Sequence, residues 1–156
     1  MIRTIPVRYT DDAIKKGYTV ILIVRSPGQL QKLIDDGRVE WEPRLAPSSA
    51  LLFQVNNWKK QGMWNQETFD KKFVDEFIDE SLEQPFADAM NDIFKRSEAG
   101  EKIALACYCG DECMCHRRIV KGLLQAVVKD PVGPNDSPYW LLRRIEQVKR
   151  YREGRL

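Results

Sequence analysis

Two short, continuously apolar segments, each followed at once by a helix-like pattern, restrict this chain to an α/β architecture. Residues 18–24 read YTVILIV, and residues 102–109 read KIALACYC. Apolar runs of this length without alternation are typical of strands buried on both faces, which occur in parallel sheets covered by helices. We therefore expect a small three-layer α/β domain with a mostly parallel sheet and helices on both faces.

Helices are predicted between and after these strands. Ser26 as N-cap, Pro27 in the first turn and a closing Gly37 predict a short helix after the first strand. Apolar residues spaced by three and four predict helices over 67–81 and 85–100, and a third from residue 117 to 128.

The remaining segments are less regular. Residues 38–62 contain two prolines and no sustained period, so we predict loops there, with a short strand near 51–55. The last segment, 141–156, carries six Arg or Lys residues and predicts a basic C-terminal helix. The 156 residues are expected to form one domain, with its core at about 18–128 and a helical extension at about 137–156.

Composition and the N-terminal residues bear on the compartment. The longest apolar run, VILIV at 20–24, is far shorter than the roughly 20 residues of a membrane span, so we expect no membrane contact. No apolar stretch with a small-residue cleavage site follows Met1, so we expect a cytoplasmic protein. A net charge of +2 is too small by itself to indicate nucleic-acid binding.

All four cysteines and the only histidine lie in one segment, CYCGDECMCHRR at 107–118. Disulfides are rare in the cytosol, which leaves three interpretations: buried structural thiols, a metal site or a reactive thiolate. Zinc or iron would be held by Cys107, Cys109, Cys113 and Cys115, although the spacing departs from the usual two-residue spacer. As strand residues, Cys107 and Cys109 face the same side of the sheet. They could bind a metal together with Cys113 or Cys115 only if the turn at 110–112 folds back.

The reactive-thiolate interpretation centres on Cys115. It lies at the start of a helix beside His116, Arg117 and Arg118, an environment that lowers a thiol pKa and attracts anions. Cys115 would be the nucleophile, His116 the proton-transfer group and Arg117 an anion clamp.

The first strand ends in a comparable junction. Arg25 and Ser26 follow it, and ligands of parallel sheets collect at the carboxyl ends of the strands. Arg25 is therefore predicted as a second clamp, and Ser26 and Arg118 as further contacts of an anionic ligand.

The cysteine segment, in its strand and helix setting, resembles the Cys-His-Arg signature of the domain-of-unknown-function 488 family. The strand ending in Arg25, with Pro27 after it, is similar to that family's Asp-Val-Arg segment, although Ile23 and Val24 stand where an acid is expected. The run LAPSSALL at 45–52 and the aromatic residues after it resemble the YeaO-like branch; these residues are Trp58, Trp64, Phe69 and Phe73.

The resemblance implies that Arg25, Cys115, His116 and Arg117 lie near one cleft, which Ser48 lines. It supplies no reaction, and the extra cysteines Cys109 and Cys113 favour metal in this member.

Two functions remain open from the sequence. One is a cysteine-dependent enzyme acting on an anionic substrate such as a nucleotide or nucleic-acid component. The other is a non-catalytic zinc- or iron-binding module that contacts nucleic acid or a protein through its basic tail and exposed tryptophans, such as Trp58, Trp64 and Trp140.

Overall fold

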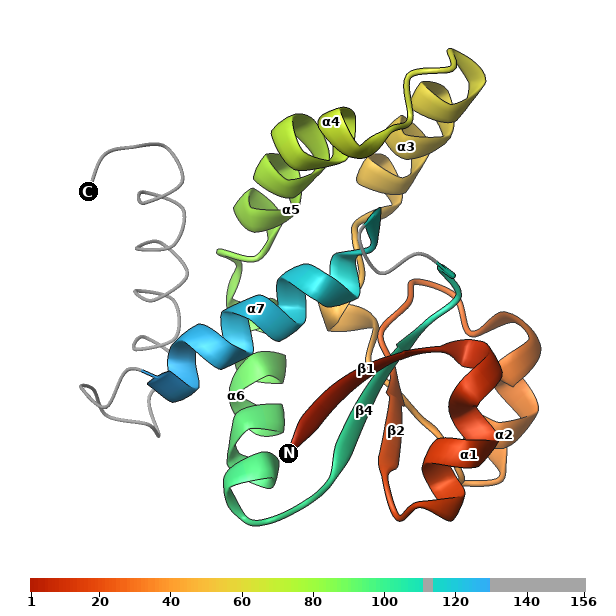
Figure 1. The fold of residues 1–156 in the computed structure, drawn as a ribbon, viewed down its shortest axis with the longest axis vertical. Coiled ribbons are helices and arrows are strands. Elements are labelled where there is room, and N and C mark those ends of the chain that lie inside the picture. The colour runs from red at the N-terminus through yellow and green to blue at the C-terminus, as the bar shows by residue number, and fades with distance from the viewer. Residues whose placement is uncertain (111–113, 130–156) are drawn as a thin grey trace.

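A parallel sheet forms the centre of the molecule. The computed structural model describes residues 1–110 and 114–129. Within them, four parallel strands lie in the order β1-β4-β2-β3, so that the last strand in sequence occupies a central place (Figure 1). The strands are β1 (Ile2–Pro6), β2 (Thr19–Leu22), β3 (Glu40–Trp41) and β4 (Ile103–Cys107).

Helices cover both faces of this sheet. On one face lie α1 and α2, and on the other lie α6 and α7 (Figure 1). The helices of the described residues are α1 (Thr10–Lys15), α2 (Gln31–Asp35), α3 (Ser49–Lys60), α4 (Gln66–Thr68), α5 (Val74–Glu80), α6 (Gln84–Glu98) and α7 (His116–Lys129). Short 3-10 turns η1 (Val7–Tyr9), η2 (Gly28–Leu30) and η3 (Pro43–Leu45) and the π-helical turn η4 (Phe69–Phe73) connect them. The three-layer prediction is confirmed.

The two cores follow from alternation along the central strand. Ile103 and Leu105 of β4 face the larger core, whereas Ala104 and Ala106 face the smaller core under α1. Successive strand residues point to opposite faces, so one apolar strand supplies both layers. The continuous apolar character of the segment is thereby explained.

The segment 38–62 differs from its prediction. It contains β3 and the twelve-residue helix α3, with no strand at 51–55. Leu51, Val55 and Trp58 are buried on one face of α3, and Ser48 caps the helix by accepting a hydrogen bond from the Leu51 N–H at 3.1 Å. The prolines precede the helix instead of interrupting it, which agrees with their preference for positions before and at helix starts.

Other expectations need smaller corrections. The core begins at Ile2 and not near residue 18, because β1 pairs with β4 along its whole length. Ser26 does not cap a helix; the chain instead turns through η2 before α2 begins at Gln31. Trp58 is buried and stacks on the half-buried Trp64, with ring centroids 5.9 Å apart, so neither offers the exposed ring of the binding-module hypothesis.

The basic C-terminal helix and Trp140 lie outside the described residues. Among the residues described, none of the helices combines the length and apolar character needed to cross a membrane.

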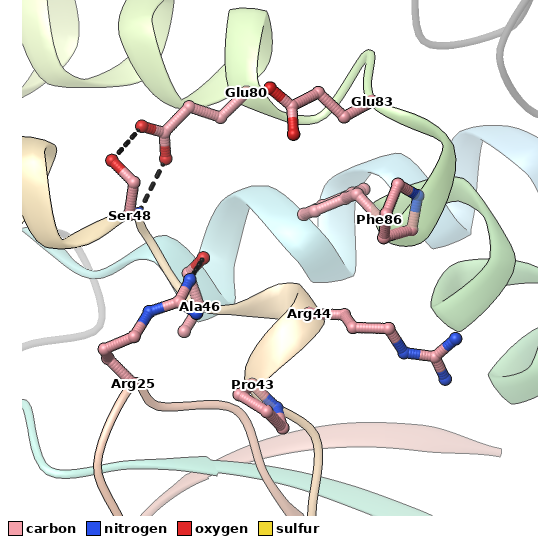
Figure 2. A pocket seen from close by; sticks show the side chains of 9 residues that line it. Arg25, Pro43, Arg44, Ala46, Ser48, Glu80, Glu83 and Phe86 are labelled. Atoms are coloured by element: carbon pink, nitrogen blue, oxygen red, sulfur yellow. Dashed lines mark hydrogen bonds between the residues drawn. The ribbon is translucent and has the colours of Figure 1, made fainter.

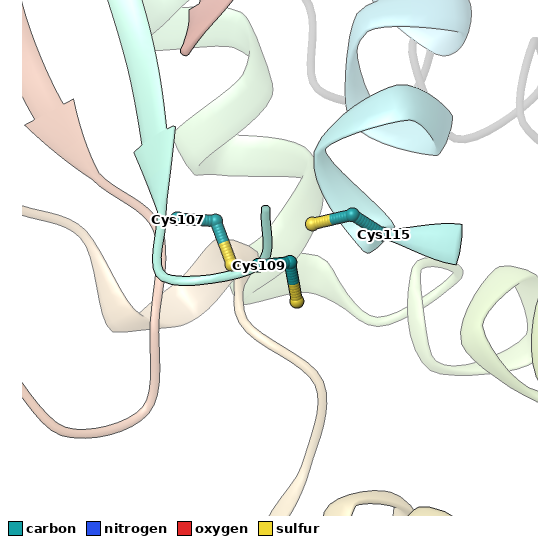
Figure 3. A group of neighbouring side chains, drawn as sticks. All are labelled: Cys107, Cys109 and Cys115. Atoms are coloured by element: carbon teal, nitrogen blue, oxygen red, sulfur yellow. The ribbon is translucent and has the colours of Figure 1, made fainter. Parts of the chain in front are cut away.

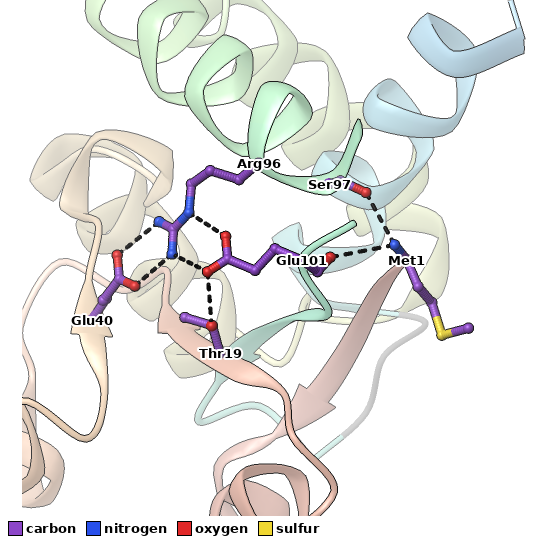
Figure 4. A network of polar contacts seen from close by, with 6 residues as sticks. All are labelled: Met1, Thr19, Glu40, Arg96, Ser97 and Glu101. Carbon is purple, nitrogen blue, oxygen red and sulfur yellow. Dashed lines mark hydrogen bonds and ion pairs between the residues drawn. The ribbon is translucent and has the colours of Figure 1, made fainter. Parts of the chain in front are cut away.

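An ion-pair network closes the amino-terminal edge of the sheet. Arg96 of α6 donates two hydrogen bonds to Glu40 at 2.8 and 2.6 Å, and two to Glu101 at 2.6 and 3.0 Å (Figure 4). The Thr19 hydroxyl donates to Glu101 at 3.0 Å. The network joins α6 to the starts of three neighbouring segments of the sheet.

Replacing Arg96 with methionine should lower the free energy of unfolding by about 1 kcal/mol at pH 7. Hydrogen bonds from Arg96 hold the pKa of the Glu101 carboxyl below its usual range. A lowered folded-state pKa gives stability that is present above the unfolded value of about 4.3 and is lost as pH falls through the folded value. Urea denaturation should therefore show the stabilities of the two proteins drawing together as the pH falls below the unfolded value.

Lys71→Met is the matched control, because the exposed Lys71–Glu67 pair should leave stability unchanged within error. An Arg96→Met deficit equally large at pH 3 would show that lost packing, and not the ion pairs, causes it.

Candidate functional site

The chain path creates a crevice at the carboxyl edge of the sheet. The helices that follow β1 and β2 pack on one face, whereas α7, which follows β4, packs on the other. A crevice opens where neighbouring parallel strands lead to opposite faces, and ligands bind there in open α/β sheets. The cysteine segment begins at this point, because Cys107 is the last residue of β4.

Three thiols meet at this edge and are called here the thiol cluster. The Sγ atoms of Cys107, Cys109 and Cys115 all lie within 4.8 Å of one another (Figure 3). Cys107 and Cys115 are 4% and 1% exposed, whereas Cys109 is exposed to solvent. The thiols of Cys107 and Cys109 thus lie close to that of Cys115, as a chelating arrangement requires. Cys113, together with Asp111 and Glu112, lies outside the described residues.

His116 points into the protein and toward the thiols. Its Nε2 lies 2.5 Å from the backbone oxygen of Ile23, and its Nδ1 lies 3.9 and 3.8 Å from the sulfurs of Cys107 and Cys115. A carbonyl only accepts, so we infer that Nε2 carries the proton. Burial lowers the pKa of His116, which favours the neutral ring. Nδ1 therefore presents a lone pair to the thiol cluster.

The thiol cluster concentrates negative charge on its exposed member. Hydrogen bonds from Cys107 and then Cys115 lower the pKa of the Cys109 thiol, and the positive charge of Arg117 adds to this. Hydrogen bonding to its two thiol neighbours raises the pKa of Cys115, and Cys109 raises that of Cys107 to about 11. The sequence predicted a lowered pKa at Cys115; its burial and its thiol neighbours reverse that expectation.

Arg117 is a buried cation beside this cluster. It is 2% exposed, and its Nη1 donates to the backbone oxygen of Cys109 at 2.5 Å. Within the described residues its Nε has no hydrogen-bond partner, and no carboxylate forms an ion pair with it. A buried charge requires compensation, and the Cys109 thiol, whose pKa Arg117 lowers, is a neighbouring group that can supply it. Arg118, in contrast, is exposed.

Arg25 and Ser48 line a separate cavity, called here the Arg25 pocket. It has a volume of about 290 Å³ and also contains Glu80 and Glu83 (Figure 2). The Arg25 guanidinium donates to the backbone oxygens of Ala46 and Pro47 at 3.1 to 3.2 Å, so Nε and Nη2 are already engaged. Ser26 is exposed nearby in the chain.

Glu80 is a residue that sequence reasoning missed. One of its oxygens accepts from the Ser48 N–H at 2.8 Å, and the other accepts a short hydrogen bond from the Ser48 hydroxyl. Glu80 belongs to α5, and its predicted helix gave no sign that it meets the start of α3. The carboxylate holds Ser48 in place and gives the Arg25 pocket an acidic wall.

The family assignment rests on a match that covers both strands of the site. The family model DUF488-N3a, described as the active DUF488-N3 subclade, matches residues 2–127. The chain belongs to the DUF488 family. Neither a curated protein nor a solved structure matches this DUF488 chain. The match runs from β1 into α7 and includes the thiol cluster, so the resemblance seen in the cysteine segment is confirmed.

Proposed function

We propose that this DUF488 protein is an enzyme that holds zinc or iron with Cys107, Cys109 and Cys115 and acts on an anionic substrate. The observation that carries the proposal is the convergence of three thiols within 4.8 Å at the carboxyl edge of a parallel sheet. Thiolates are the preferred ligands of zinc and of iron–sulfur centres. Such a centre, when bound, would act as a Lewis acid toward a substrate oxygen or a water molecule.

The charges around the thiol cluster support a cationic occupant. A divalent ion with three thiolates carries one net negative charge, which the buried guanidinium of Arg117 would offset. Without an ion, sulfurs this close together must share protons so that they do not all carry negative charge. A metal–thiolate centre would thus account for the buried positive charge of Arg117.

The proposed catalytic arrangement uses the exposed side of the cluster. Cys109 faces solvent, whereas Cys107 at the end of β4 and Cys115 just before α7 would anchor the centre. His116 holds its ring on the Ile23 carbonyl and would position or exchange a proton at Nδ1. Arg25, Ser26, Ser48 and Arg118 remain predictions as substrate contacts, and a nucleotide or nucleic-acid component remains the predicted substrate.

A non-catalytic metal module is the second candidate. Its support is the position of the His116 ring. The Nδ1 atom lies within 3.9 Å of two of the sulfurs, and the Nε2 atom donates to a carbonyl. A metal-bound histidine usually has this arrangement, with one ring nitrogen toward the metal and the other donating a hydrogen bond. With His116 or Cys113 as fourth ligand the centre would be closed, which is typical of structural zinc.

Elemental mass spectrometry of the untagged protein tests the proposal directly. We expect about one zinc or iron ion per chain, and thiols that resist alkylation until a chelator is added. After chelation the exposed Cys109 should react first. A protein that carries no metal after growth with both ions, and binds neither in dialysis, would overturn the proposal.

Cobalt substitution separates the enzyme from the module. Added azide should change the visible spectrum of the cobalt protein if one coordination position is open to solvent. An unchanged spectrum would favour the closed, non-catalytic module.

A further inference from the structure

A second cavity, called here the Arg8 pocket, lies at the carboxyl ends of β1 and β4. Its volume is about 390 Å³, within the range of small-molecule sites. Residues from three segments line it, among them Val7, Arg8, Thr10, Gln29, Leu30 and Tyr108. Like the thiol cluster, it lies at the edge where ligands of parallel sheets bind.

The Arg8 pocket lies next to the chain neighbours of Cys109, the exposed member of the thiol cluster. Tyr108, which precedes Cys109, lines the pocket. Gly110, which follows Cys109, lies so close that a β-carbon there would be 3.8 Å from a guanidinium nitrogen of Arg8. The residue before Cys109 therefore lines the pocket and the residue after it lies beside Arg8, although Cys109 itself is not a lining residue.

One wall of the Arg8 pocket is held in place by Tyr108. The tyrosine hydroxyl donates a short hydrogen bond to the backbone oxygen of Pro27 and accepts one from the Leu30 N–H at 3.2 Å. Gly28 has a φ of 56°, and a β-carbon there would lie 3.0 Å from the tyrosine oxygen. Only glycine fits this turn without strain, so the wall is shaped before any ligand arrives.

The chemistry of the lining indicates an anion with a less polar body. Within the described residues, Arg8 forms no ion pair and no hydrogen bond; its guanidinium only lies 4.9 Å from the ring of Tyr9. Leu30 and Leu33 add apolar surface, and the Gln29 amide adds a donor and an acceptor. Asp11 also lines the pocket, and its carboxylate lies 4.0 Å from the guanidinium of Arg38. The Arg25 pocket contains two carboxylates, Glu80 and Glu83, and donors of Arg25 already bind carbonyl oxygens. The Arg8 pocket contains one carboxylate, Asp11, which pairs with Arg38, so the Arg8 pocket is the better anion site.

We propose that the Arg8 pocket binds the substrate of this enzyme, a mononucleotide whose phosphate is held by Arg8 and whose base or sugar packs on Leu30 and Leu33. The claim that the bound nucleotide reacts at the thiol cluster rests on the proposed function, because the reaction needs a metal centre there. Binding itself needs only the pocket. Arginine suits this role because its planar guanidinium forms paired, charge-assisted hydrogen bonds with phosphate.

Isothermal titration calorimetry of the full chain with AMP, GMP, CMP and UMP tests the inference. At least one monophosphate should bind, and its nucleoside and inorganic phosphate should bind more weakly. Arg8→Gln should weaken the binding about tenfold or more, since a hydrogen bond to a charged group is lost. Arg3→Gln is the control, because Arg3 is an exposed arginine of β1, the strand that leads to Arg8, and it packs on Tyr18 outside the pocket.

A second pair of variants tests the shaped wall. Tyr108→Phe should also weaken binding, whereas Tyr9→Phe should not. Lack of binding by all four nucleotides would overturn the inference, as would binding that Arg8→Gln leaves unchanged. Loss on Arg25→Gln in place of Arg8→Gln would move the site to the Arg25 pocket, and binding of an oligonucleotide without any mononucleotide would equally refute it.

The titration is run on both metal-loaded and chelated protein, so that the two proposals fail separately. A protein that takes up no metal but binds a nucleotide through Arg8 refutes only the metal centre. A metal-loaded protein that binds no nucleotide refutes only the Arg8 pocket.

Discussion

Cys107→Ser is expected to reduce bound metal from about one ion per chain to a trace and to lower the midpoint of thermal unfolding by about 10 °C. The thiol is buried at the end of β4, and serine supplies a weak ligand in its place. Metal that binds only the folded state stabilises that state, so its loss appears directly in unfolding. Elemental analysis and calorimetry of the same preparation measure both effects.

Ala106→Ser is the matched control for this change. It places the same hydroxyl at a fully buried position of the same strand, at a residue that supplies no metal ligand. It should be destabilising but should keep its metal. Cys113→Ser then decides the fourth ligand, and a Cys107→Ser protein with full metal content would contradict the assignment.

Phe77→Ala should lower the free energy of unfolding by about 3–5 kcal/mol. Phe77 is fully buried on α5 and packs on the rings of Phe73, Phe86 and His116, with centroids 5.7 to 5.9 Å away. The cavity left by the ring forfeits these contacts, and the loss is a large share of the roughly 5–15 kcal/mol of a typical domain. Urea denaturation should show a lower midpoint with an unchanged slope.

Phe53→Ala provides the comparison, since Phe53 is 67% exposed on α3 and should cost less than about 0.5 kcal/mol. Because Phe77 also supports the His116 ring, its replacement should weaken metal binding as well. Equal stabilities for the two variants would show that the packing of Phe77 on the neighbouring rings does not stabilise the core.

The sequence predicted the central parts of the fold and the place of the site. The strand that ends at Cys107 and the helix that begins at His116 have apolar patterns strong enough to be predicted from the sequence alone. The helix α3 was missed although Leu51, Val55 and Trp58 recur at helical spacing, because the preceding prolines suggested a loop. β1 was missed because Arg3 and Thr4 interrupt its apolar character, and only pairing with β4 defines it.

The chemistry of the site was harder to predict than its position. A helix start and basic neighbours favour a thiolate at Cys115, but two thiols brought within 4.8 Å and nearly complete burial outweigh them. Arg8 was overlooked because it stands alone in the sequence. Its importance comes from Tyr108 and Gly110, about a hundred residues later, which spacing alone does not place beside it.

The strand order has a consequence for synthesis on the ribosome. β1 pairs only with β4 among the described strands, and β2 pairs with β4 along its whole length. Translation runs from the N-terminus, so the first strand waits until residues 103–107 have left the exit tunnel before it gains a partner. The nascent chain therefore exposes unpaired strand edges for most of its elongation, a state in which chaperones recognise newly made proteins.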